Sequence, residues 1–128
     1  MQNQIVVRFS DGKILKGTTA DLFPNKALFH LKDKDSETLH EIDIFYLKAV
    51  YFVKCFDGNP DYDEKTDIER VGLGKKIKIH FTDGETLVGY TQGYSPNRDL
   101  FIVFPCDPDS NNEKVFVVTK ATSMVSFI

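Results

Sequence analysis

The chain has 128 residues, enough for one ordinary domain or two very small ones. Hydrophobic residues make up 41% and charged residues 27%, as in soluble globular proteins, and no apolar run is long enough for a membrane-spanning helix. The net charge of -3 comes from the acidic segment 55–70, so neither flanking segment has the basic excess of a protein that binds nucleic acid mainly through phosphates. Residues Met1–Gln4 lack the features of a signal peptide. We therefore expect a cytoplasmic protein that is not bound to a membrane.

Short runs of β-branched and apolar residues, separated by turn residues, predict five strands in the first half of the chain. We expect these strands at residues 5–9, 14–22, 27–32, 39–44 and 49–53. Asp11-Gly12 predicts a tight turn after the first strand, because glycine accepts positive φ. Gly17, inside the second strand, predicts a bend or bulge where the sheet curls. A short 3₁₀ turn is expected at residues 45–48.

The same layout returns 72 residues later in the chain. Segments 9–29 and 81–101 align without a gap and are identical at ten of 21 positions, which predicts an internal duplication. In this second copy we expect strands at residues 75–81, 86–94, 100–104, 115–118 and 124–128. Between the copies, residues 55–74 predict an acidic, turn-rich linker, and residues 63–70 within it fit one or two helical turns.

Five short strands with a bent second strand predict a small barrel, because so small a sheet buries its apolar face by curling over on itself. The order of strands and turns resembles the Sm-like subset of SH3-type barrels. The motifs that carry this resemblance are Phe9-Ser-Asp-Gly12, Gly17 and Asn25-Lys-Ala-Leu28, followed by Phe81-Thr-Asp-Gly84, Gly89 and Asn97-Arg-Asp-Leu100. We expect an all-β fold of two tandem five-stranded barrels, at residues 1–54 and 75–128, joined by the linker 55–74.

Longer motifs in the chain resemble an uncharacterised bacterial domain family over its full length. They are Phe-x-Asp-Gly with Gly-Tyr-Thr, Ser-Pro-Asn-Arg, Leu47–Val53 followed by Phe56-Asp-Gly58, and the segment 109–116. This resemblance implies a bacterial protein and agrees with the expected fold. It implies no particular activity.

Residues with catalytic or metal-binding chemistry form no recognised pattern. His30, His40 and His80 match no metal-motif spacing, and none recurs in the other copy. Segment 61–67 lacks the glycine and glutamate positions of a calcium loop, and segment 107–112 predicts a polar hairpin loop, with a weakly held cation as the alternative. Cys55 and Cys106 are expected to be reduced, with a disulfide or redox pair as the alternative. We predict no catalytic residue, metal site or cofactor, and hence no enzyme.

The repeated Pro-Asn turns are the candidate ligand-binding surface. Each presents an amide and a cation, Asn25 with Lys26 and Asn97 with Arg98, and the aromatic Tyr94 lies close in sequence. In Sm-like barrels the asparagine of this turn contacts an RNA base. The resemblance therefore implies that the two asparagines contact bases and the two cations contact phosphate. The family's second RNA-contact motif, an Arg-Gly pair between the last two strands, is missing from both copies.

We therefore expect a non-catalytic binding or regulatory module whose partner is a protein, with RNA or nucleotide binding at the Pro-Asn turns as the alternative. The apolar segments Val50–Val53 and Val125–Ile128 occupy equivalent positions in the two copies. The resemblance to Sm-like barrels places such late strands near an exposed edge. This predicts edge-to-edge strand pairing, within the chain or between chains as in a homodimer.

Overall fold

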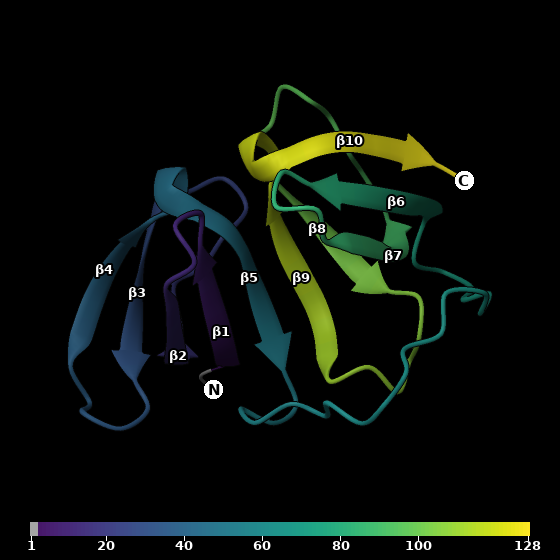
Figure 1. Cartoon of the computed structure of the whole chain (residues 1–128). Helices are drawn as coiled ribbons and strands as arrows, with labels where there is room; N and C mark the ends of the chain where they lie inside the picture. The colour runs from purple at the N-terminus through teal and green to yellow at the C-terminus, as the bar shows by residue number, and fades with distance from the viewer. Residues whose placement is uncertain (1–2) are drawn as a thin grey trace.

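The computed structural model describes residues 3–128 and contains ten β-strands in two sets of five (Figure 1). Met1 and Gln2, at the start of the segment without signal-peptide features, lie outside the described residues. The first set is β1 Asn3–Phe9, β2 Ile14–Thr19, β3 Leu28–Asp33, β4 Leu39–Asp43, the 3₁₀ turn η1 Ile44–Tyr46 and β5 Leu47–Val53. The second set is β6 Lys75–Phe81, β7 Thr86–Thr91, β8 Leu100–Pro105, β9 Asn112–Val118, the 3₁₀ turn η2 Thr119–Ala121 and β10 Thr122–Phe127. No helix within residues 3–128 has the length and apolar character needed to span a membrane.

The two sets share one order of elements and one register of strand pairing. β1, β2 and β3 begin 72 residues before β6, β7 and β8, whereas β5 begins 75 residues before β10, because the loop before β9 is longer than its counterpart. Pairing partners follow the same offsets, since Phe29 lies opposite Ile42 in the first set and Phe101 lies opposite Val117 in the second. The predicted Asp-Gly turns connect β1 to β2 and β6 to β7.

Gly17 and Gly89 lie where the backbones of two strands approach most closely. A Cβ atom on Gly17 would lie 1.9 Å from the carbonyl oxygen of Lys32 in β3, and one on Gly89 would lie 2.3 Å from the carbonyl oxygen of Phe104 in β8. At these bends β2 and β7 form only two residue pairs each with the next strand. Any side chain would push the strands apart, so this close approach requires glycine.

All ten strands form one open antiparallel sheet, in the order β10-β6-β7-β8-β9-β5-β1-β2-β3-β4 (Figure 1). The all-β class is confirmed, but two separate five-stranded barrels are not, because the sheet is open and β4 and β10 remain at its two ends. The reason lies in the central pair of strands. β5 pairs with β1 on one side and with β9 on the other, so it cannot close the first set onto β4. The division into units 1–54, 55–74 and 75–128 stays a prediction.

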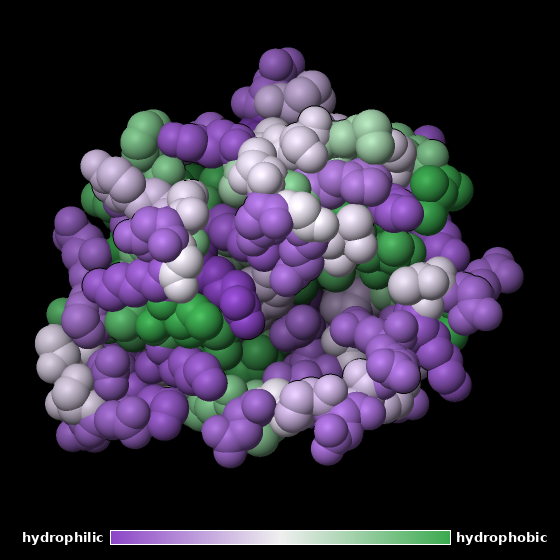
Figure 2. Space-filling model, viewed as in Figure 1, coloured by the Kyte–Doolittle hydropathy of each residue, from purple (hydrophilic) through white to green (hydrophobic). Residues whose placement is uncertain are grey.

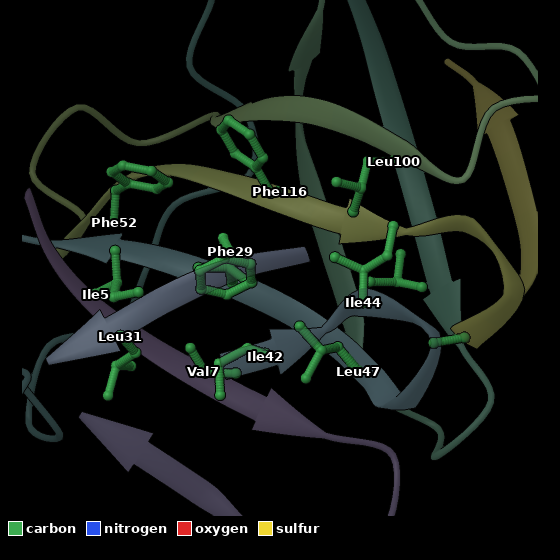
Figure 3. Packing of buried hydrophobic residues seen from close by; sticks show 13 residues of the cluster. Ile5, Val7, Phe29, Leu31, Ile42, Ile44, Leu47, Phe52, Leu100 and Phe116 are labelled. Carbon is green, nitrogen blue, oxygen red and sulfur yellow. The ribbon is translucent and has the colours of Figure 1, made fainter. Parts of the chain in front are cut away.

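The pairing of β5 with β9 buries both faces of the central strands and divides the core into two clusters. Every residue of β5 is buried. Val50 and Phe52 face the first cluster, whose inward-pointing side chains are seen in Figure 3, while Ala49 and Tyr51 face the second. The second set of strands contributes four residues to the first cluster, namely Leu100, Phe116, Val118 and Ala121. Each half therefore completes the core of the other.

The linker, residues 55–74, contains neither strand nor helix, so the predicted helical turns at 63–70 are absent. It is fastened to the loop between β8 and β9. The Tyr62 hydroxyl donates to the Asp107 carboxylate at 2.5 Å, and the Lys65 N–H donates to the same group at 2.9 Å. The Tyr62 hydrogen bond lowers the pKa of Asp107, and that same bond raises the pKa of Tyr62 to about 12. Cys55 and Cys106 are both free thiols.

Candidate functional site

The two Pro-Asn turns, which lie far apart in the sequence, meet at one hollow of about 480 Å³. We call it the turn hollow. It brings together the four predicted polar residues Asn25, Lys26, Asn97 and Arg98, and its other lining residues are Pro24, Ala27, Ile44 and Asp99. All four polar residues are exposed. Two cations and one carboxylate therefore face the hollow, which leaves it with an excess of positive charge.

Both turns are held by backbone hydrogen bonds rather than by their asparagine side chains. The Lys26 N–H donates to the carbonyl of Phe23, and the Arg98 N–H donates to the carbonyl of Ser95. The second turn is also tied to η2, because the Thr119 hydroxyl donates to the carbonyl of Arg98 at 2.6 Å. The amide groups of the asparagines are thus presented on a fixed backbone.

Tyr94, which was predicted together with the four polar residues, lies outside the turn hollow. Its ring packs edge-on against Phe101, with the ring centroids 4.8 Å apart, and against Phe127 at 6.3 Å. Tyr94 lines a different hollow, beside Lys75 and Gly93. The side chain is half-buried as part of the packing of the second half, and this packing accounts for an aromatic residue at that position.

The turn hollow is connected, through a smaller hollow, to a larger one beside β4. A hollow of about 330 Å³ shares Ala27, Ile44 and Asp99 with the turn hollow. That second hollow shares Asp43, Phe45 and Lys120 with the largest one, of about 690 Å³. We call the largest one the edge groove. It runs beside β4, and its lining residues are Phe9, Ser10, Asp11, Lys13, Leu15, His40, Glu41, Ile42, Asp43, Phe45, Tyr46 and Lys120.

Aromatic side chains form an exposed wall of the edge groove. Phe45 and Tyr46 are 57% and 61% exposed, and their rings meet edge to face at 5.2 Å. The Asp43 carboxylate fixes the start of η1 by accepting from the Phe45 N–H at 2.9 Å, and the Lys120 ammonium lies 3.1 Å from the centre of the Phe45 ring. The sequence predicts this segment only as a 3₁₀ turn. Its signal was the presence of two adjacent aromatic residues in an element too short to bury them.

The backbone of β4 forms one side of the edge groove and lacks a strand partner there among residues 3–128. The Ile44 N–H donates to the carbonyl of Ala27, and hydrogen-bonded pairs alternate along an antiparallel ladder from that point. The backbone groups of Leu39 and Glu41 therefore point away from β3. Leu39 is also 67% exposed, so the outer side of β4 combines free hydrogen-bonding groups with apolar surface.

The corresponding groove in the second half of the chain is filled by β5. There β5 lies along β9, the counterpart of β4, with Val50 opposite Phe116. Lys48, whose side chain is 8% exposed, reaches the turn after β6, with its ammonium 2.7 Å from Asp83 and 3.2 Å from Glu85. The hydrogen bond from Lys48 holds the pKa of Asp83 below its ordinary value of 3.8. The fold therefore contains the same groove twice, once occupied and once open.

A further hollow, of about 420 Å³, lies between the two halves and the linker. In the view of Figure 2, hydrophobic residues gather over β1, β2 and β3, beside this hollow. Three residues that line this hollow contact one another: the Tyr51 hydroxyl donates to Glu85 at 3.5 Å, and the Arg8 guanidinium lies over the Tyr51 ring. Burial, with the nearby Glu85 charge, raises the pKa of Tyr51. This hollow belongs to the joint between the halves.

The histidines stand apart from these hollows, except for His40 in the edge groove. His30 lies 2.6 Å from the Asp21 carboxylate through Nδ1 and 3.8 Å from Glu41 through Nε2. Desolvation acts against the charged form of Asp21, but the hydrogen bonds from His30 prevail and lower its pKa. Within residues 3–128, no three histidine, cysteine or acidic side chains are grouped in a way that would hold a metal ion.

The comparisons with known proteins identify a family without describing an activity. No curated protein and no solved structure shows significant similarity to the chain. A family model described as "Family of unknown function (DUF6982)" matches residues 1–128. The chain therefore belongs to this family.

Proposed function

We propose that this protein is a non-catalytic binding module that takes up an extended strand of a protein partner in the edge groove. One observation carries the proposal: the edge groove is the open counterpart of the groove that β5 fills beside β9. A strand added to a sheet edge gains main-chain hydrogen bonds, and its alternate side chains enter pockets that select the sequence.

The filled groove indicates what an added strand would gain. In it, the Phe52 ring lies 5.2 Å from the Phe116 ring, and the Lys114 ammonium lies 4.7 Å from the centre of the Phe52 ring. The edge groove offers comparable chemistry along β4. Phe9 and Leu15 pack on the first core cluster and form its floor, and Phe45 forms part of its exposed wall. We expect it to prefer peptides with large apolar side chains at alternate positions.

The charged groups around the edge groove favour a partner of mixed charge. Asp11, Glu41 and Asp43 contribute carboxylates, while Lys13 and Lys120 contribute cations. Asp11 accepts from the backbone N–H of Lys13 at 2.9 Å, which fixes the carboxylate at the rim. Neither sign dominates, so apolar contacts and backbone pairing would supply most of the affinity.

The test uses a displayed library of random nonapeptides, selected on the full chain and then measured by calorimetry. We expect the selected peptides to bind at least tenfold more weakly to Glu41→Pro, because proline removes an outward-facing N–H without touching the β3–β4 bonds. Val71→Pro, in the linker, is the matched control and should bind normally. Phe45→Ala, at an exposed ring, provides a second variant that leaves the backbone of β4 unchanged. Selected peptides whose affinity is independent of both changes would disprove the proposal.

A second candidate function is RNA or nucleotide binding at the turn hollow, and it is favoured by the meeting of two amides and two cations there. Fluorescence anisotropy with a labelled oligouridylate would test it. We expect affinity to fall between about 50 and 200 mM salt, because cations that contact phosphate release counterions. Asn25→Ala with Asn97→Ala should abolish binding, while Asn59→Ala in the linker should not. An affinity that is the same in all three proteins would rule this function out.

A further inference from the structure

The sheet ends in two open strands, and each presents at least one exposed apolar side chain. On β4, Leu39 is 67% exposed, and on β10, Met124 and Phe127 are 53% and 56% exposed. Edge strands are commonly protected from other chains by charged residues or proline. β10, with the sequence Thr-Ser-Met-Val-Ser-Phe, contains neither. This edge is therefore suited to pairing with another strand.

The pairing inside the chain shows which strand fits which edge. By the offsets between the two sets, β5 corresponds to β10 and β4 corresponds to β9. β5 and β9 pair within the chain. If two molecules pair in the same way, β10 of one molecule lies along β4 of the next. The pair Phe52 with Lys114 then becomes Phe127 with Leu39, and Val50 with Phe116 becomes Val125 with Glu41.

On both edge strands, the residues that this register brings opposite one another have backbone N–H and C=O groups that point outward from the sheet. The Ile128 N–H donates to the carbonyl of Lys76, so the alternation of the ladder directs the backbone groups of Val125 and Phe127 away from β6. Leu39 and Glu41 point outward on β4 for the same reason. The residues brought opposite one another are thus those with free donors and acceptors. A shift by one residue would lose this match.

Side chains at the two edges also suit each other. Phe127 and Leu39 would lie directly opposite, and each would bury apolar surface that is now exposed. In the internal pairing, Lys48 is matched by Asp83 and Glu85. The corresponding residues at the open ends are Ser123, Asp11 and Lys13. Ser123 thus stands in place of the cation Lys48, and Lys13 stands in place of the carboxylate Glu85. Asp11 and Lys13 then balance each other, so no charge is left unmatched.

We infer that the strand bound in the edge groove is β10 of a second copy of this chain, paired antiparallel and head to tail. The inference rests on the proposed function, because it names the occupant of the same groove. The contact joins two different surfaces, so each added copy leaves one β4 and one β10 free. Assembly then extends or closes into a ring.

The test exploits the fact that each edge can be blocked separately. Light scattering should give wild-type protein a mass that rises above the 14.6 kDa of one chain as concentration increases. Leu39→Asp and Phe127→Asp should each stay monomeric, because a charge replaces the exposed apolar contact. Mixed in equal amounts, they have one intact pair of edges between them, and the mixture should form a species of twice the chain mass. Val71→Asp, at a residue 93% exposed in the linker, should behave as wild type.

Three results would overturn the inference. They are a wild-type chain that stays monomeric at about 1 mM, where even weak associations are populated; a single variant that dimerises alone, which would mean that an edge pairs with itself; and a mixture that does not associate. Melting curves check folding, and Leu39→Ser with Phe127→Ser replace any aspartate variant that unfolds. A monomeric wild type that still binds selected peptides in the edge groove would disprove the inference while leaving the proposed function intact.

Discussion

At the scale of single residues, the sharp bends of the sheet depend on two glycines. Gly17 and Gly89 leave no space for a Cβ atom, because the carbonyl oxygens of Lys32 and Phe104 lie against them. The pattern of hydrophobic residues alone does not predict how closely β2 approaches β3 or β7 approaches β8. The two glycines inside the predicted strands mark the positions where another backbone comes close, because a glycine there gives up side-chain packing.

Gly17→Ala tests this requirement. The added methyl group must displace the β3 backbone, and we expect a loss of about 1–3 kcal/mol in the free energy of unfolding, as for an overpacked core. Gly93→Ala is the control, because a Cβ there meets nothing within 4 Å, and its effect should stay within about 0.5 kcal/mol. Urea unfolding followed by circular dichroism measures both variants. Equal stability of the two would show that β3 can move aside freely.

At the scale of elements, local sequence signals located the strands well and placed some of their ends wrongly. β6 occupies Lys75–Phe81, as predicted. β2 was expected to continue to residue 22 but ends at Thr19. The chain leaves the strand there because Asp21 is engaged across the bend, accepting from the His30 N–H at 2.8 Å. The helical turns expected at 63–70 are replaced by side-chain bonds to the linker, such as the one from Tyr90 to Ile68.

The arrangement of the strands was harder to predict than the strands themselves. Residues 47–53 form an almost continuous apolar run, which is typical of a strand buried on both faces. That signal indicated a central strand, whereas resemblance to small barrels placed the segment near an edge. Edge-to-edge pairing was predicted either within the chain or between chains. The structure shows it within the chain, where β5 pairs with β9.

The candidate site was predictable in part. Asn25, Lys26, Asn97 and Arg98 were selected because they repeat, but their meeting at one hollow depends on how the two sets of strands join. The edge groove was not predicted, because it depends on β4 being left open at the end of the sheet. A local pattern identifies turn residues, whereas a surface formed between distant segments requires the topology.

At the scale of the whole molecule, both core clusters draw residues from both halves of the chain. Leu100, Phe116 and Val118 belong to the first core cluster, and Val6, Ala49 and Tyr51 belong to the second. Removing either half would expose one edge of a central strand and part of the surface that both clusters bury. A unit of roughly 55 residues is marginal even with a complete core, because it buries a smaller share of its surface than a larger domain does.

We therefore expect residues 1–54 and 55–128, prepared separately, to show no cooperative thermal unfolding as monomers. Mixing them should restore the circular dichroism spectrum of the full chain and give a complex with its mass, because β5 and β9 can then pair and complete both core clusters. A full-length chain cut at a protease site engineered beside Gly72 is the control, since the cut removes no core residue and should leave the complex intact. If residues 1–54 alone instead melt cooperatively as a monomer, the first half closes its own core and the shared core is not needed for folding. The melting transition of that fragment decides between one folding unit and two.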